Sequence, residues 1–364
     1  MCLRIIYGKS TWNTVKHCPA GELVMNKKTY QIGAFNAWLV ALLMVPVAYG
    51  QVGIAPNDIE RVGQSGWQFL KINVDPRQAA MGGAFTTASY GDANAVFGNP
   101  AALAQVAKYD LQLNSTSWLA DIKVQSVAFA AAVGDLGVFA VSVVSLDYGD
   151  IPETINSLVA GESRTEAVVT GNMFSARDLA AGVSYGRAIT DKLSIGGSVR
   201  WLRQEIAELA MNNWALDFGT VYYTGYRSLR LAMSARNFGP DSRLAGWSEE
   251  YQSEPDDIRM PLDFRVGFAM DFLQAEGSPH LLTVVIDGDH PNDGPEKLHL
   301  GAEYMFDKNF SLRGGYKFNY DEQSFTLGAG LNYSLIGSTA CLNYAYVDFG
   351  ALKQVHMFSI GVKF

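Results

Sequence analysis

Val355-His-Met-Phe-Ser-Ile-Gly-Val-Lys-Phe364 closes the chain with alternating apolar and polar side chains. On an extended backbone one face carries Phe358, Ile360, Val362 and Phe364, and the other carries Met357, Ser359, Gly361 and Lys363. This period of two predicts a strand with one apolar face. The pattern recurs back to about Tyr109, which indicates a wall of strands closed on itself. A barrel with an apolar exterior belongs in a membrane.

Strand-like segments fill the chain from Tyr109 onward, and we expect about fourteen of them. Their predicted spans are 109–118, 122–133, 136–148, 176–189, 192–204, 213–223, 228–238, 262–272, 279–288, 297–306, 309–319, 323–335, 338–348 and 353–364. Where the alternation is clearest, charges fall on one face only, as a water-facing lumen requires. The inward positions read this way include Arg200, Arg230, Arg236, Arg265, Glu303, Arg313 and Lys317. We therefore expect an all-β transmembrane antiparallel barrel.

The predicted connections differ in length according to their order. The even-numbered connections are short, such as those at 134–135, 190–191 and 307–308, whereas the odd-numbered ones include long stretches at 149–175, 205–212, 239–261 and 289–296. In bacterial outer-membrane barrels the periplasmic turns are short and the outer loops are long. The pattern predicts the bacterial outer membrane, with the carboxyl terminus on the periplasmic side and lipid around the wall.

Charge and cysteine content narrow the function classes. The formal net charge of -8 over 364 residues, without a basic cluster, argues against nucleic acid as a partner. Of the three cysteines, Cys2 and Cys18 fall in a segment expected to be absent from the mature protein. Only Cys341 then remains, so no intramolecular disulfide is expected.

The amino-terminal region is typical of a targeting segment. A basic start at Met25 precedes an apolar run over 37–47, and Ala48-Tyr49-Gly50 forms a cleavage site with small residues. We interpret 25–50 as a signal peptide and 1–24 as an upstream extension that is not part of the natural start. An uncleaved anchor is the alternative.

Residues 51–108 differ from the strands that follow and are expected to form a hatch, or plug, in the lumen of a barrel over 109–364. Asn99 can cap a short helix at about 100–106, and Pro100 suits its first position. Gly82 and Gly83 allow close backbone packing or positive φ. A barrel of fourteen strands is too wide for wall side chains alone to fill, so a plug is expected.

A family resemblance rests on three stretches of the hatch. They are Phe69-Leu-Lys-Ile, then Arg77-Gln-Ala-Ala-Met-Gly-Gly-Ala-Phe, then Asp92-Ala-Asn-Ala-Val-Phe-Gly-Asn-Pro-Ala-Ala-Leu-Ala. Together they resemble the opening of the PorV/PorQ family, within the FadL-like group of outer-membrane barrels. Ala80 and Ala102 depart from the glycines usual in that pattern. The resemblance implies a structural or gating role for Gly82, Gly83, Asp92, Asn99 and Pro100.

Two functions follow from this resemblance as expectations. The PorV/PorQ type implies a non-enzymatic component associated with type IX protein secretion or surface export, with secretion-system proteins or secreted cargo as partners. The alternative is a FadL-like channel for long-chain fatty acids or other hydrophobic small molecules. That alternative predicts an apolar pocket beside the hatch and a gap or kink in the wall.

The sequence predicts neither a catalytic site nor a metal site. The histidines of the mature chain, His280, His290, His299 and His356, lie in no recognisable catalytic motif, and no Gly-x-Ser-x-Gly elbow is present. We therefore expect no enzyme activity and no cofactor. Acidic residues over 287–296 suggest a calcium loop, but Pro291 and Pro295 interrupt the spacing, so a solvated outer loop is expected instead. The acidic run over 247–257 is interpreted as a mobile loop or a docking surface.

Overall fold

The computed structural model describes residues 63–84, 86–87, 91–158, 165–243, 257–274 and 277–364. The chain divides into two compact units, Met1–Asp58 and Ile59–Phe364. All described residues belong to the second unit. The expected upstream extension at 1–24, the signal peptide at 25–50 and the beginning of the hatch lie outside the described residues.

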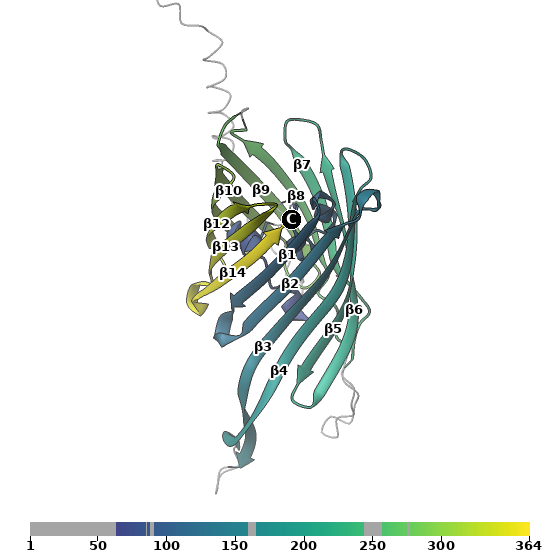
Figure 1. Ribbon diagram of the computed structural model, residues 1–364. Coiled ribbons are helices and arrows are strands. Elements are labelled where there is room, and N and C mark those ends of the chain that lie inside the picture. The colour runs from purple at the N-terminus through teal and green to yellow at the C-terminus, as the bar shows by residue number, and fades with distance from the viewer. Residues whose placement is uncertain (1–62, 85, 88–90, 159–164, 244–256, 275–276) are drawn as a thin grey trace, which may run out of the picture. The chain divides into compact units, whose positions relative to one another are not determined.

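Fourteen antiparallel strands close into a single barrel, in which each strand pairs with its neighbours in sequence and β1 pairs with β14 (Figure 1). The strands are β1 (Tyr109–Ser117), β2 (Lys123–Ala132), β3 (Val138–Leu158), β4 (Thr165–Ala188), β5 (Leu193–Ile206), β6 (Leu209–Tyr223), β7 (Arg230–Phe238), β8 (Asp263–Phe272), β9 (His280–Pro291), β10 (Lys297–Phe306), β11 (Phe310–Phe318), β12 (Phe325–Leu335), β13 (Ser338–Asp348) and β14 (Gln354–Lys363). The predicted barrel and its strand number are confirmed.

The closing segment forms the seam of the barrel. Leu113 and Thr116 of β1 lie opposite Ile360 and Met357 of β14, respectively. Phe358 and Ile360 are more than half exposed, while Val355 and Met357 are buried. The apolar residues exposed along the other strands, such as Phe139, Leu312 and Leu342, form the lipid-facing exterior of an outer-membrane barrel.

The connection predicted at 149–175 is mostly strand, so this prediction was wrong. Strands β3 and β4 extend beyond β2 and β5 as a two-stranded ribbon, from the pair Asp150–Ser175 to the pair Leu158–Thr165. Gly149 and Gly171, which favour a loop in the sequence, instead take positive φ at irregularities of the pairing. The predicted loops at 205–212 and 289–296 are likewise shortened by strand residues. The acidic run over 247–257 lies outside the described residues except for its last residue, Asp257.

The hatch contains four short helices before β1, and these lie inside the wall (Figure 1). They are η1 (Gln68–Lys71), α2 (Pro76–Ala80), η2 (Ala93–Phe97) and η3 (Pro100–Gln105). Three further single turns, η4 (Leu119–Asp121), η5 (Gly134–Leu136) and η6 (Gly350–Leu352), lie in connections between strands. The helix predicted at 100–106 is present as the 3₁₀ helix η3. None of the helices in the described ranges has the length and apolar character needed to cross a membrane.

We call the end of the barrel at the odd-numbered connections the outer end and the opposite end the inner end. The outer end carries the ribbon and the long connection between β7 and β8, whereas β10–β11 and β12–β13 are joined by tight turns at the inner end. By the usual asymmetry of outer-membrane barrels, the outer end faces the cell exterior and the inner end faces the periplasm.

Candidate ligand-binding lumen

Helix η3 is fixed to the inner surface of β4, β5 and β6. The side chain of Asn99 caps the helix by accepting from Ala101 N at 3.1 Å, and its amide donates to the carbonyl of Thr86 at 2.9 Å and of Thr220 at 3.1 Å. Opposite it, any Cβ at Gly219 would meet Asn99 Oδ1 at 1.9 Å. A Cβ at Gly196 would meet the backbone of Pro100 at 2.4 Å. These wall glycines, which have no side chain, therefore make room for the helix.

Helix α2 packs chiefly against β12 and β13, and the turn after it packs against β10 and β11. Gly82 has φ +71°, and a Cβ there would lie 2.7 Å from the carbonyl oxygen of Leu300. Thr326 Oγ1 accepts from Gly82 N at 2.8 Å and donates to Ala80 O at 2.9 Å. His299 Nδ1 faces inward, is buried and donates to Gly82 O at 2.7 Å. Glycine is thus required at position 82 both for its φ and for its contact with the wall.

An ion-pair network also joins α2 to the wall. Arg77 donates to both carboxylate oxygens of Glu303, at 3.1 Å from Nε and 2.6 Å from Nη2. Arg313 donates to the same carboxylate at 2.7 Å and to Asn343 Oδ1 at 2.9 Å. Asp92, a predicted hatch residue, is buried with one carboxylate oxygen 3.8 Å from Arg77.

The predicted hatch residues do not form one site. Asn99 and Pro100 lie against β4–β6, Gly82 and Gly83 against β10–β11, and Asp92 faces Arg77 and Asp110. What they share is contact between the hatch and the wall. Their gating role stays a prediction.

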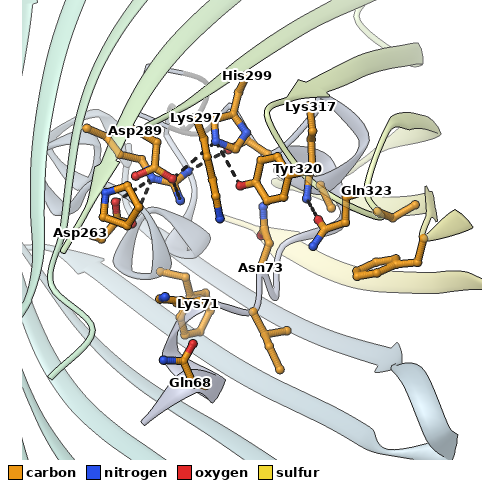
Figure 2. Close-up of a pocket in the computed structure, with 18 of the residues that line it drawn as sticks. Gln68, Lys71, Asn73, Asp263, Asp289, Lys297, His299, Lys317, Tyr320 and Gln323 are labelled. Carbon is orange, nitrogen blue, oxygen red and sulfur yellow. Dashed lines mark hydrogen bonds and ion pairs between the residues drawn. The ribbon is translucent and has the colours of Figure 1, made fainter. Parts of the chain in front are cut away.

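A cavity of about 300 Å³ lies on the outer side of the hatch (Figure 2). One wall is apolar and the other is polar and charged. The apolar wall is formed by Ile72, Phe97, Trp118, Val347, Phe349 and Met357, and the polar wall by Lys71, Asn73, Arg236, Asp263, Arg265, Asp289, Lys297, His299, Lys317, Tyr320 and Gln323. We call this space the outer cavity.

Two lysines of the outer cavity have no carboxylate partner among the described residues. The Lys317 amino group donates to the neutral side chain of Gln323, and Lys297 lies over the ring of Tyr320 with its nitrogen 4.2 Å from the ring centre. Burial raises the pKa of the Tyr320 hydroxyl, so that ring stays neutral at physiological pH. Two amino groups therefore face the cavity with no carboxylate of the described residues within ion-pair distance, although Asp289 of the same wall acts on both from farther away (Figure 2).

Other charged side chains of this wall form ion pairs with neighbouring residues. Arg265 lies 3.0 Å from both Asp263 and Asp289. Lys71 is paired with Asp293 in the connection after β9. Burial raises the pKa of Asp293, but hydrogen bonds from Lys71, Ser65 and Gln68 outweigh this and lower it. The carboxylate considered for a calcium loop is thus held by η1 and its neighbours.

A second pocket, of about 350 Å³, lies at the outer ends of β3–β6. It is lined mainly by apolar side chains, namely Ile151, Ala176, Ile206, Leu209, Ala210 and Met211, together with Tyr148, Asp178, Gln204 and Glu205. Tyr148 and Met211 also pack against an apolar cluster that includes Trp67, Phe69 and Leu202. Since Ile72, Phe97 and Trp118 pack against the same cluster, apolar contacts run from this outer pocket to the outer cavity.

A third space, the inner cavity, lies on the periplasmic side of α2 and measures about 210 Å³. Its lining is polar and comes from the hatch and from the inner ends of β1 and β10–β14: Asp75, Arg77, Asp92, Asn94, Gln112, Met305, Arg313, Asn332, Cys341, Asn343 and Lys363. Burial, with the nearby charge of Asp92 as a smaller cause, raises the pKa of Asp75 to about 7. The hatch thus separates two cavities of different character.

Sequence reasoning located the charged wall residues better than the aromatic ones. All seven inward charged positions face the lumen, as shown by their contacts or lining positions. Trp118, Tyr148 and Tyr223 lie near the predicted strand ends, where the sequence alone suggests aromatic girdles at the membrane interface, but in the structure they point inward. Tyr148 donates to Asp178 at 2.6 Å, and Tyr223 bonds with Gln105 of η3. Lys297 and Tyr320 were missed, because no local pattern marks a strand-end lysine and a loop tyrosine that meet in the lumen.

The wall has one irregularity beside the outer cavity. Between Leu216–Phe238 and Phe218–Ala235, β7 contains one residue more than β6, which defines a β-bulge. Asn237 takes φ +62° there and donates its backbone N–H to Asp217 Oδ1 at 2.8 Å. Its side chain accepts from Arg200 at 2.6 Å and donates to Pro261 O at 2.9 Å. Polar side chains therefore fill the bulge, and the gap or kink expected of a channel stays a prediction.

No family model and no curated protein matches the sequence. Solved structures match in fold. The Pseudomonas putida toluene transporter TodX is 14% identical, with a TM-score of 0.51 over 79% of this chain and 96% of that one. The CymD monoaromatic hydrocarbon channel is also 14% identical, with a TM-score of 0.50 over 80% of this chain and 98% of that one.

This likeness shows the fold. The closed barrel with its apolar exterior is the architecture of bacterial outer-membrane proteins. Both neighbours are described as a transporter or a channel. Nothing in the comparisons points to the PorV/PorQ branch or to secretion.

Proposed function

We propose that this barrel is a conduit for hydrophobic small molecules that carry an acidic head group, with long-chain fatty acids as the leading class. The observation that carries the proposal is the outer cavity, in which an apolar wall faces the amino groups of Lys297 and Lys317. A buried charge is costly unless it is paired, so an anionic group on the ligand would complete this site.

The apolar wall of the outer cavity and the mainly apolar outer pocket suit a ligand with a tail. A head group at Lys297 and Lys317 would leave the tail against Trp118 and Phe97, and these side chains pack on the cluster that continues to the outer pocket. A long tail could follow these contacts toward the outer end. An apolar surface beside the hatch is what the channel alternative expects, and this supports the proposal.

The named ligands of the structural neighbours support the broader class only. TodX and CymD are described as proteins for toluene and for monoaromatic hydrocarbons, which carry no charge. A neutral hydrocarbon would leave the two lysines of this chain without a partner. For that reason we favour an amphiphile with an acidic head over a hydrocarbon.

Binding of matched ligands to the purified barrel tests this proposal. Palmitate and hexadecanol share their tail length and differ in the charge of the head. We expect palmitate to bind at least 10-fold more tightly, since a paired buried charge is worth about 1.5–3 kcal/mol. Lys317→Met should remove most of this preference, while Lys192→Met, at the inner turn between β4 and β5, should keep it. Equal binding of the two ligands to the wild type would refute the preference for an acidic head group. If neither ligand bound, the proposed conduit for hydrophobic molecules would be refuted.

A second candidate is the secretion-associated role that the PorV/PorQ resemblance implies. The ribbon of β3 and β4 supports it, because no other described strand pairs with its edges beyond the barrel and Ile155, Val168, Val169 and Met173 are exposed. Unpaired strand edges are common docking sites for extended polypeptides. Comparison of secreted and surface proteins with and without the gene tests it, and an unchanged set would rule this role out.

A further inference from the structure

Two amino groups of the outer cavity lie around one aromatic ring. Lys297, the first residue of β10, holds its nitrogen 4.2 Å from the centre of the Tyr320 ring, and Lys317 of β11 holds its nitrogen 5.3 Å from the same centre. The two nitrogens are therefore separated by no more than the sum of these distances. Figure 2 shows the two side chains on either side of Tyr320. Because lysine side chains are long and flexible, one head group beside this ring is within reach of both.

Neither amino group is neutralised at close range in the part of the lumen that the structure describes. Lys317 donates to the uncharged side chain of Gln323, and the nitrogen of Lys297 lies over an aromatic ring. Asp289 acts on both lysines from farther away. Its carboxylate lies 3.0 Å from Arg265, with which it forms an ion pair. Both lysines are thus able to pair with an anion that enters the cavity.

A third hydrogen-bond donor belongs to the same cavity. Asn73 accepts from Asp75 N through its side-chain oxygen at 3.0 Å. Its side-chain nitrogen is buried and has no hydrogen-bond partner among the described residues. Asn73 lines the outer cavity, and in Figure 2 its side chain points toward Tyr320. A buried donor without a partner is costly, so a ligand oxygen that reaches this nitrogen would be favoured.

We propose that the outer cavity selects amphiphiles whose head group is a phosphate monoester. This inference rests on the proposed conduit and specifies the acidic head group that binds there. A phosphate monoester carries a charge of about −1.5 to −2 at pH 7 and three terminal oxygens that accept hydrogen bonds. The charge matches the two amino groups, and the three oxygens match the three donors Lys297, Lys317 and Asn73.

A carboxylate head group leaves part of this site unused. It has one charge and two oxygens, so it neutralises only one of the two lysines. Fatty acids are therefore ligands of the cavity, but a phosphate with the same tail binds more tightly. The tail contacts the same apolar wall in both cases, including Phe97 and Trp118. The head group alone thus decides between these ligands.

Three ligands of one tail length separate the charge of the head group from its shape. Laurate is planar with one charge, dodecyl sulfate is tetrahedral with one charge, and dodecyl phosphate is tetrahedral with up to two. We expect dodecyl phosphate to bind the purified barrel at least 10-fold more tightly than dodecyl sulfate at pH 8. The second ionisation of a phosphate monoester has a pKa of about 6, so this ratio should fall toward one at pH 5.

The outcomes of this comparison distinguish the inference from the proposed function. Equal binding of dodecyl sulfate and dodecyl phosphate at pH 8 would overturn the inference. The conduit for acidic amphiphiles would still stand in that case if laurate bound more tightly than dodecanol. Failure of laurate, dodecyl sulfate and dodecyl phosphate alike to bind would refute the conduit itself.

A lysine variant tests whether the second charge is recognised at this place. Lys297→Met removes one amino group and keeps a long side chain, so the phosphate-to-sulfate ratio at pH 8 should fall at least 5-fold. Lys192→Met, at the inner turn between β4 and β5, should keep the wild-type ratio. An unchanged ratio in Lys297→Met, with the barrel folded by its heat-dependent gel mobility, would contradict the proposed site.

Inorganic phosphate distinguishes an amphiphile from a free phosphate as the ligand. Because it has no tail to contact the apolar wall, it should displace bound dodecyl phosphate only at a concentration at least 100-fold above that of the amphiphile. Displacement at equal concentrations would show a site for free phosphate and would overturn the assignment to an amphiphile.

Discussion

At the residue scale, Asp75 makes the stability of the hatch depend on pH. Its carboxylate caps α2 by accepting from Arg77 N at 3.0 Å, and burial with the nearby Asp92 raises its pKa to about 7. An acid whose pKa is raised on folding favours the folded state most when it is protonated. Its contribution is therefore complete below about pH 4 and is lost as the pH rises through about 7.

The variant Asp75→Asn isolates this effect, because Asn caps helices about as well as Asp. Wild type and variant should have similar stability at pH 4, and the variant should be more stable at pH 8 by up to about 4 kcal/mol. Thermal unfolding followed by tryptophan fluorescence at both pH values measures the difference. A wild-type advantage that grows with pH would contradict the raised pKa.

Asn99 is the residue with the most specific role in the hatch. In Asn99→Ala, the carbonyls of Thr86 and Thr220 and the N–H of Ala101 lose their side-chain partner. We expect a loss of about 2–4 kcal/mol in local stability, since each buried polar group left unpaired costs about 1–3 kcal/mol. Hydrogen exchange of peptides covering 91–106 reports this loss. Asn99→Ser keeps an acceptor for the cap and should recover about 1 kcal/mol.

At the element scale, the fit between η3 and β5 depends on which face of the strand lacks a side chain. A Cβ at Gly196 would meet Pro100 at 2.4 Å, whereas one at Gly197 would meet its nearest neighbour, Asp217 O, at 3.3 Å. Gly196→Ala should therefore expose η3 to hydrogen exchange, and the adjacent Gly197→Ala should not. Equal protection of η3 in both variants would show that the hatch tolerates displacement from β5.

The strands and the cap of η3 could be predicted because their signals are local. Alternation over 298–306 and the Asn99-Pro100 pair act within a few residues. The cavities could not be predicted, since Lys71 and Asp293, or Gly82 and Thr326, meet only after the barrel closes. Aromatic residues at strand ends were misplaced because a shift of one residue in register reverses the face on which a side chain lies. The ribbon was missed because glycine and proline favour a loop in the sequence whereas irregular pairing accommodates them.

At the scale of the whole molecule, the ribbon is structurally independent of the barrel. Beyond the pair Pro152–Met173, β3 and β4 pair with each other and with no other strand in the described part of the chain. Replacement of residues 153–172 by a two-residue turn should leave barrel assembly and ligand uptake unchanged, because Ile151 and the rest of the outer pocket are retained. Heat-dependent gel mobility and palmitate uptake measure both. Failure to assemble would show that the ribbon is needed for folding, and loss of secretion alone would favour the docking role.

The length of the ribbon also determines which part of the protein is most accessible from outside the cell. Nine strand residues from Asp150 to Leu158 span roughly 30 Å at about 3.3 Å per residue. That reach is comparable to the thickness of a bilayer's hydrocarbon core, so the tip stands well clear of the lipid surface. Antibodies and bacteriophages approaching an intact cell would encounter this ribbon before any other described part of the chain. An epitope inserted between Leu158 and Thr165 would allow the protein to be labelled with antibodies on living cells.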